Sequence, residues 1–305
     1  MTDMALNPAG ATVWQRLYYG KTLPVLTVLL SLLVIWYAGA VYLNKDTLIS
    51  NYERNDISWD AEKLISDAWA MERPILPAPH QIATEINKTV FQKKITSKRS
   101  LVYHAWVTTS ATLLGFGMGS ILGILLAVGI VHVQTLDRSL MPWVIASQTI
   151  PILAIAPMII VVLGNLGITG TIPKSIISMY LCFFPITIGM VKGLRSPDVL
   201  QMDLMRTYSA STGQIFWKLR VPASVPFLFT SLKVAVAISL VGAIVGELPT
   251  GAVSGIGARL LSGSYYGQTI QIWSALIVAS VLGMLLVYLV SMIEKIVMSK
   301  MGYRA

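Results

Sequence analysis

The chain has 305 residues, of which 55% are hydrophobic and 12% charged; its mean hydropathy is +0.69 and its formal net charge is +9 at pH 7. A soluble domain normally carries about a quarter charged residues, so this composition indicates an integral membrane protein and excludes a soluble catalytic domain. The single cysteine, Cys182, excludes an intrachain disulfide and a cysteine cluster, and we expect it to be a small packing residue.

Six apolar stretches are long enough to cross a hydrocarbon core of about 30 Å, which predicts an all-α, polytopic membrane protein with six transmembrane helices. The first is longer than the apolar core of a secretory signal, so we interpret it as retained. Only a short glycine-rich link separates the third from the fourth, which predicts a helical hairpin. The predicted spans are Thr22–Leu43, Ala105–Val131, Pro142–Gly164, Pro173–Val191, Pro222–Gly246 and Ile270–Met292.

Basic residues are concentrated on one side of the predicted membrane. The side of the two termini carries eleven Lys and Arg residues against five acids, whereas the loop Asn44–His104 holds nine basic and eight acidic residues. Because Lys and Arg accumulate in cytoplasmic loops, we expect both termini and the segment 196–222 in the cytoplasm. This bias accounts for most of the net charge and weighs against a nucleic-acid partner. The basic residues are Arg16, Lys21, Arg138, Lys192, Arg195, Arg206, Lys218, Arg220, Lys295, Lys300 and Arg304, and the acids are Asp3, Asp137, Asp198, Asp203 and Glu294.

The loop after the first span carries two amphipathic segments. Apolar residues at helical spacing predict one helix over Trp59–Glu72, which Pro74 stops, and a second over His80–Phe91. Two interpretations stay open: these helices cap the bundle at the bilayer surface, or they receive a partner. The chain is therefore divided into residues 1–104, a transmembrane helix with an insert on the outer side of the membrane, and residues 105–305, a five-helix core with the cytoplasmic loop 196–222.

Glycine and proline mark special positions within the spans. Gly115, Gly119 and Gly123 recur every four residues and predict a groove in which another helix backbone approaches closely. Pro151 and Pro157 lie in the third span, and each removes a helical hydrogen bond and favours a kink. Since freed backbone groups in a membrane are tolerated beside protein or water, these prolines are candidates for the wall of a translocation pathway.

The polar segment from Ser196 to Pro222 interrupts the apolar pattern. Ser196, Pro197 and Asp198 predict a helix start, with a hydroxyl cap and proline at the first helical position. Ser211 and Gln214 have the spacing of a capping box, which predicts a second short helix that Pro222 ends. Two short helices at an angle would form a compact projection able to enter a cleft of another protein. The apolar stripe of the first helix consists of Leu200, Leu204 and Tyr208.

This segment resembles the EAA loop of permease subunits of bacterial ABC importers, whose pattern is E-A-A, three residues, G, nine residues, I-x-L-P. Ala210, Ser211, Phe216 and Pro226 also stand where this family places such residues. The resemblance implies a loop that couples the permease to an ATPase. The matching positions are Asp203-Leu204-Met205, followed by Arg206, then Ser209, and Leu219-Arg220-Val221-Pro222.

The similarity runs from about Leu76 to the C-terminus and is greatest to the nitrate, sulfonate and taurine branch, which includes permeases for thiamine-precursor pyrimidines and riboflavin. This part of the match is carried by the phrases Ile75–Pro79, Gln148–Pro157, Gly246–Pro249 and Ser254–Gly257. The resemblance implies the type I ABC importer permease fold in the bacterial inner membrane. It also implies a homodimer, two cytoplasmic ATP-binding subunits and a periplasmic substrate-binding protein.

The sequence offers no enzymatic site of its own. Gly20-Lys21-Thr22 matches the end of a phosphate-binding loop, but the required earlier glycine would fall at Gln15. The three histidines lack ligand spacing, so we predict no metal or cofactor. Hydrolysis of ATP is therefore assigned to a separate subunit. The alternative is a secondary transporter or channel, against which the absence of an internal repeat argues.

Two ionisable residues fall within or near the fifth span. Lys233 and Glu247 are 14 residues apart, which places them on a similar helical face, and such residues usually face a bundle interior or a cavity. For Lys233 a salt bridge with another span and a substrate contact stay open, whereas a structural or gating role is favoured for Glu247. Substrate identity also stays open. Aromatic residues that would suit a flat heterocycle, or serve as interface anchors, are Trp106, Tyr265, Tyr266 and Trp273.

Overall fold

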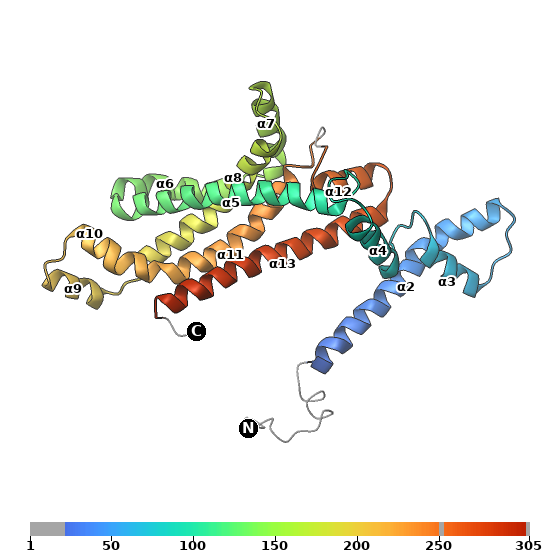
Figure 1. The fold of residues 1–305 in the computed structure, drawn as a ribbon, viewed down its shortest axis with the longest axis horizontal. Helices are drawn as coiled ribbons and strands as arrows, with labels where there is room; N and C mark the ends of the chain where they lie inside the picture. Colours follow the sequence, from blue (N-terminus) through green and yellow to red (C-terminus); the bar gives the residue numbers. More distant parts are fainter. Residues whose placement is uncertain (1–21, 250–252, 303–305) are drawn as a thin grey trace, which may run out of the picture.

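The computed structural model describes residues 22–249 and 253–302, which form a bundle of helices without strands (Figure 1). The predicted all-α fold is confirmed. Of the residues discussed above, Asp3, Gln15, Arg16, Gly20, Lys21 and Arg304 lie outside the described ranges. The elements are α2 (Thr22–Arg54), α3 (Ala61–Ala70), α4 (Pro79–Ile86), the π-helical turn η1 (Asn87–Phe91), α5 (Leu101–His132), α6 (Gln134–Ala146), the 3₁₀ turn η2 (Ser147–Thr149), α7 (Ile152–Asn165), α8 (Thr171–Leu194), α9 (Val199–Thr207), α10 (Thr212–Ile215), the π-helical turn η3 (Phe216–Arg220), α11 (Val221–Val245), α12 (Ile256–Tyr265) and α13 (Thr269–Lys300).

Within residues 22–249 and 253–302, five helical stretches are long and apolar enough to cross a membrane, and a sixth is present if one bent pair counts as a single span. The predicted first, second, fourth and sixth spans lie within α2, α5, α8 and α13. The fifth, Pro222–Gly246, coincides with the last part of a helical stretch that runs from Thr212 to Val245, and Gly246 is the C-cap residue of that stretch. The protein is therefore a polytopic membrane protein, as its composition predicted.

The third predicted span is not one continuous helix, which corrects the prediction for Pro142–Gly164. The chain breaks between α6 and α7, and the two halves meet at 99°. Pro151 lies at this break, and the residue before it, Ile150, is extended with φ −81° and ψ 122°, as steric conflict with a following proline favours. The Tyr180 hydroxyl of α8 donates to the Ser147 carbonyl at 2.7 Å, which satisfies one backbone group near the break.

The centre of the bundle is a close contact between α5 and α8, where the predicted glycine groove is confirmed. A Cβ added at Gly115 would lie 2.5 Å from the Cβ of Ser178, and one at Gly119 would collide with Cys182 Sγ. Glycine at these positions is therefore required by the distance between the helices. Cys182 is fully buried in this contact, as expected of a packing residue.

The insert between α2 and α5 folds largely as predicted. Helix α3 begins after Asp60, whose carboxylate accepts from the Lys63 N–H at 2.9 Å, and it buries Ala68 against α2. The second predicted helix is found as α4 with its π-helical extension η1. At the start of α13, Trp273 packs on Trp36 of α2 with ring centroids 4.9 Å apart.

The two ends of the bundle differ in what they carry (Figure 1). At one end lie α9, α10 and the last turns of α13, which we call the loop end. At the other end lie α4, α12 and the first turns of α13, which we call the insert end. The candidate sites are distributed between these ends.

Candidate functional sites

The polar segment between α8 and α11 projects from the loop end as two short helices, as predicted (Figure 1). Its first helix starts later than predicted. Asp198 is the N-cap residue of α9, and the Gln201 side chain accepts from the Asp198 N–H at 3.3 Å. Ser196 instead donates its hydroxyl to the Gly193 carbonyl at 2.7 Å, which helps close the end of α8. The cap assigned to Ser196 and the first helical position assigned to Pro197 are therefore wrong by two residues.

A tight turn joins α9 to α10, and Ser209 lies at its centre. This residue has φ +50°, a left-handed conformation that glycine adopts without strain. The turn is held by the Ala210 N–H, which donates to the Met205 carbonyl at 3.0 Å. The position matched to the glycine of the EAA pattern therefore has a backbone conformation that explains a glycine there.

The second helix has the predicted capping box. The Ser211 N–H donates to the Gln214 side chain at 2.9 Å, and the Gln214 N–H donates to the Ser211 hydroxyl at 3.3 Å. The helix does not end at Pro222, which corrects the prediction. The turn η3 lets the Val221 N–H reach the Phe216 carbonyl five residues back. The hydrogen-bond pattern thus shifts in the turn directly before Pro222, and the chain continues into α11 without a break.

The outward face of α9 is apolar, and its side chains are exposed in the structure. Leu200, Leu204 and Tyr208 have exposed fractions of 80%, 56% and 77%. Their i, i+4, i+8 spacing places them on one stripe. An exposed ion pair between Arg206 and Asp203, at 3.1 Å, lies on the same helix. A stripe of this kind is a typical contact surface for another protein.

The base of this projection is attached to the bundle. Phe216 packs edge-on against His132 at the end of α5, with ring centroids 4.9 Å apart. Phe216 and Val221 also pack against a buried cluster that contains Met190 of α8, while Leu219 is half-buried. A force applied to α9 and α10 therefore reaches α5, α8 and α11 through direct contacts.

A buried polar cluster lies near the insert end and centres on Glu247, just beyond α11. The Glu247 carboxylate is fully buried and accepts from the Thr108 hydroxyl at 2.9 and 3.0 Å and from the Gly257 N–H at 2.9 Å. The Lys174 ammonium of α8 lies 3.5 Å away. Gly255 has φ +120°, and a Cβ there would collide with this carboxylate. The cluster thus ties the loop before α12 to α5 and α8.

His104 extends the same cluster on α5. Its Nδ1 accepts from the Gly255 N–H at 3.0 Å, so its Nε2 carries the proton that faces the Lys98 carbonyl at 2.9 Å. These two bonds fix a neutral imidazole. His104 therefore holds the backbone of the loop before α12 in place. Among residues 22–249 and 253–302, no cluster of three or more His, Cys, Asp or Glu side chains could hold a metal ion.

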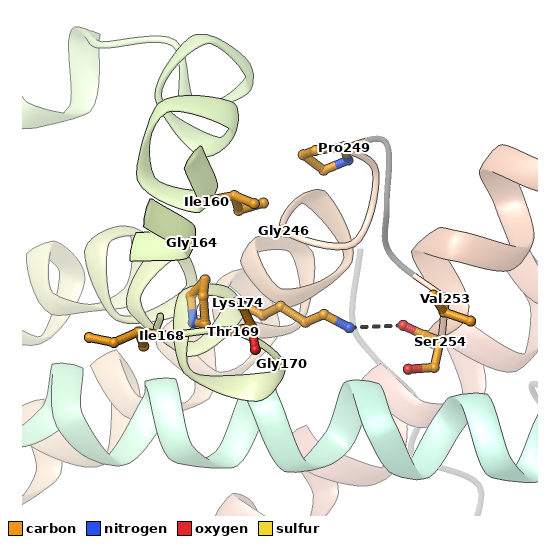
Figure 2. A pocket seen from close by; sticks show the side chains of 11 residues that line it. Ile160, Gly164, Ile168, Thr169, Gly170, Lys174, Gly246, Pro249, Val253 and Ser254 are labelled. Atoms are coloured by element: carbon orange, nitrogen blue, oxygen red, sulfur yellow. Dashed lines mark hydrogen bonds between the residues drawn. The ribbon is translucent and has the colours of Figure 1, made fainter. Parts of the chain in front are cut away.

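A pocket of about 360 Å³ adjoins this cluster, because Lys174, which lies 3.5 Å from Glu247, also lines the pocket. Figure 2 shows the residues that line this pocket. Helix α7 contributes Ile160 and Gly164, and the loop after α11 contributes Pro249. Lys174 reaches across and donates to the Ser254 carbonyl at 2.8 Å. The sequence analysis missed Lys174. Lys174 is an ionisable residue inside the predicted fourth span, and the same kind of signal in the fifth span singled out Lys233.

Lys233 forms an ion pair with Glu294 of α13 at 2.9 Å. Of the two interpretations left open, the structure contains the salt bridge with another span. The predicted shared face of Lys233 and Glu247 is wrong, because Glu247 lies beyond Val245, where α11 ends, and contacts α5 and α8 instead. Helical periodicity does not extend past the end of a helix.

The candidate pathway prolines lie on the bent pair. Pro151 is exposed at the break, and Pro157 is exposed within α7, which stays helical around it. Of the aromatic residues considered for substrate contact, Trp106, Tyr265 and Tyr266 point outward with about 70% exposure, whereas Trp273 packs on α2.

An all-helical bundle with a glycine-mediated central contact, a broken span and a projecting two-helix loop is typical of the membrane subunit of a transporter. The comparisons agree: residues 119–303 match the family described as binding-protein-dependent transport system inner membrane component. The chain therefore belongs to this family, and the resemblance stated from the sequence is confirmed.

Individual relatives carry names for several different solutes. The chain is 29% identical over 220 residues, 71% of its length and 84% of the relative's, to the formylaminopyrimidine transport permease protein of Halalkalibacterium halodurans. It is 29% identical over 222 residues, 73% and 79% of the two lengths, to the riboflavin transport system permease protein of Chloroflexus aurantiacus. It is 23% identical over 233 residues, 76% and 80%, to the putative aliphatic sulfonates transport permease protein of Bacillus subtilis.

Proposed function

We propose that the chain is the permease subunit of an ATP-driven importer and that the segment 196–222 docks its ATP-binding subunits. The observation that carries this proposal is the uncovered apolar stripe of α9 on a projection whose base is packed against three long helices. A secondary transporter or channel does not need such a projection. The family membership supports the same conclusion.

The docking surface consists of the stripe together with the turn that follows it. In this proposal the stripe of Leu200, Leu204 and Tyr208, with the adjacent Met205, enters a groove of the ATP-binding subunit. The conformation of Ser209 sets the angle between α9 and α10. Movement of the ATP-binding subunits would then tilt α11 through Phe216 and Val221. The remaining positions assigned to the coupling loop are Asp203, Arg206, Ala210, Ser211, Leu219 and Pro222.

The assembly would contain two ATP-binding subunits, a second copy of the permease and a periplasmic binding protein. A second copy would need an apolar surface, and α7 offers one. Leu153, Met158 and Val161 have large exposed fractions on this helix. Lipid is the other occupant of such a surface, so a cross-link between two copies at Met158 is the test of this part of the proposal.

The orientation proposed for the chain puts the loop end and both termini in the cytoplasm of a bacterium. The basic residues Arg195, Lys218 and Arg220 at the loop end support it, because Lys and Arg accumulate on the cytoplasmic side. In the same orientation the insert of the first proposed domain, residues 1–104, lies on the periplasmic side. Labelling of single cysteines from either side of the membrane tests it.

The pathway is proposed to run beside α7 and the loop after α11, where Pro151, Pro157 and Glu247 lie. The cluster around Glu247 would act as a gate by holding or releasing the loop that contains Ser254. For Lys233, the ion pair with Glu294 supports a structural role at the edge of the pathway.

The proposed substrate is a small polar solute, either an anion of the nitrate, sulfonate or taurine kind or a nitrogen heterocycle of the pyrimidine kind. The names of the relatives support both classes. The outward exposure of Trp106, Tyr265 and Tyr266 favours interface anchoring over stacking on a substrate.

Copurification tests the central part of this proposal. The tagged chain should bring an ATP-binding subunit with it from bacterial membranes. A cysteine introduced as Leu204→Cys should cross-link to that subunit, and the single native cysteine, Cys182, is fully buried and should leave little background. Transport of a solute by the purified chain without ATP would instead favour the secondary transporter or channel.

A further inference from the structure

A second pocket, of about 480 Å³, lies at the insert end, and its walls are strongly basic. It is formed by the loop before α4, by α4 and η1, by the loop before α5, by α12 and by the first turn of α13. It is separate from the segment 196–222, and it shares no lining residue with the pocket of Figure 2. Its charged residues are the basic Arg73, Lys88, Lys93, Arg99 and Arg259 and the acidic Glu72 and Glu85.

The charged side chains of this pocket form no close ion pairs in the part of the chain that the structure describes. Among residues 22–249 and 253–302, none of the seven takes part in an ion pair within 4.0 Å. Five cations therefore face two carboxylates that do not contact them closely. Such a surplus of positive charge in a concave site concentrates anions.

Arg259 provides the most specific signal. Its Nε is buried and has no hydrogen-bond partner among the described residues. Burial lowers the pKa of Arg259, and the charge of Glu85 opposes this effect. A buried guanidinium donor without an acceptor costs free energy, and an oxyanion in the pocket would supply the missing acceptor.

The start of α13 adds to this arrangement. Gln268 is its N-cap residue, and the Gln268 side chain makes no capping hydrogen bond to the N–H groups of the first turn. Ile270 and Gln271 of this turn line the pocket. The positive end of a 32-residue helix thus adjoins the same basic walls.

We propose that this pocket binds an oxyanion, such as a sulfate, phosphate, sulfonate or carboxylate group. Arg259 would donate to two oxygens of the group, Lys93 would supply a second charge, and the first turn of α13 would contribute backbone N–H groups. The anion is either a free solute or the headgroup of a phospholipid. The proposal does not depend on coupling to an ATPase.

The first experiment uses the purified, delipidated full chain and sodium sulfate at millimolar concentration, with sodium chloride added to keep the ionic strength constant. Lys93 lines the pocket and Lys94 does not, so Lys93→Gln and Lys94→Gln are matched variants that each remove one charge. Sulfate should raise the unfolding midpoint of the wild type and of Lys94→Gln. Lys93→Gln should weaken sulfate binding about tenfold, because one charge-assisted contact is lost.

The second experiment tests the lipid source. The same three proteins are placed in nanodiscs of phosphatidylcholine with phosphatidylglycerol and then extracted in detergent, and the retained phosphatidylglycerol is quantified. If the wild type and Lys94→Gln retain phosphatidylglycerol and Lys93→Gln does not, the site binds a phospholipid headgroup. If the three proteins differ in their sulfate response but not in retained phosphatidylglycerol, the site binds a free solute. Equal behaviour of the two variants in both experiments would overturn the proposal.

Discussion

Replacing Leu200 by aspartate should uncouple the chain from its ATP-binding subunits without unfolding it. Leu200 has an exposed fraction of 80%, so aspartate there meets water in the free chain. Substitutions at such positions usually change stability by less than about 0.5 kcal/mol. The substitution should therefore affect the binding of a partner to the stripe of α9 and leave the stability of the chain unchanged.

The magnitude follows from the surface available for burial. Full burial of a leucine side chain stabilises by about 1.5–3 kcal/mol, and most of the Leu200 side chain is still free to be buried. Loss of this contact, with a carboxylate in its place, should weaken docking by at least about 1.4 kcal/mol, which is about tenfold per loop. Leu200→Met keeps the apolar contact and is the matched control.

The assay measures the affinity of the purified chain in nanodiscs for its ATP-binding subunit, together with the thermal midpoint of each variant. The expected result is docking that is at least tenfold weaker for Leu200→Asp, near wild type for Leu200→Met, and unchanged thermal midpoints. Equal affinity of both variants for the ATP-binding subunit would refute the assignment of α9 as the docking surface.

Three further predictions concern the fold and the candidate pathway. Glu247→Ala should lower the free energy of unfolding by about 3–5 kcal/mol in a detergent denaturation series, because the buried Lys174 ammonium loses its counterion; an unchanged value would contradict the buried pair. Ser209→Gly should raise stability by up to about 1 kcal/mol and Ser209→Val should lower it by about 1–3 kcal/mol, since the turn requires positive φ; the opposite order would contradict that conformation. Lys233→Met should cost about 1 kcal/mol, and adding Glu294→Met should restore most of it and leave transport intact, whereas loss of transport in the double variant would assign Lys233 to substrate contact.

Composition and periodicity were sufficient to predict the helical bundle and most of its spans. Stretches such as Ala105–Val131 are apolar over the thickness of a bilayer, and backbone hydrogen bonds within a helix are the simplest way to satisfy such a segment in lipid. The glycine repeat of α5 was also sufficient to predict a close helix contact. Both signals are local, so they do not depend on the rest of the fold.

The errors arose where the outcome depends on contacts between distant segments. The break at Pro151 turns the chain by 99°, and Tyr180, far along the chain, donates to the backbone beside it. Pro222 does not end a helix, because a π-helical turn before it shifts the hydrogen-bond pattern. The partners of Glu247 come from three other parts of the chain, which no helical wheel of α11 contains.

The measurement that tests the central claim most directly is solute uptake by proteoliposomes that contain the chain, its ATP-binding subunit and its binding protein. Formylaminopyrimidine, riboflavin, nitrate and an aliphatic sulfonate are offered in turn. We expect accumulation of one of these solutes that requires ATP and all three components and that falls sharply with Leu200→Asp. Accumulation that persists without ATP, or that is unaffected by Leu200→Asp, would contradict the account.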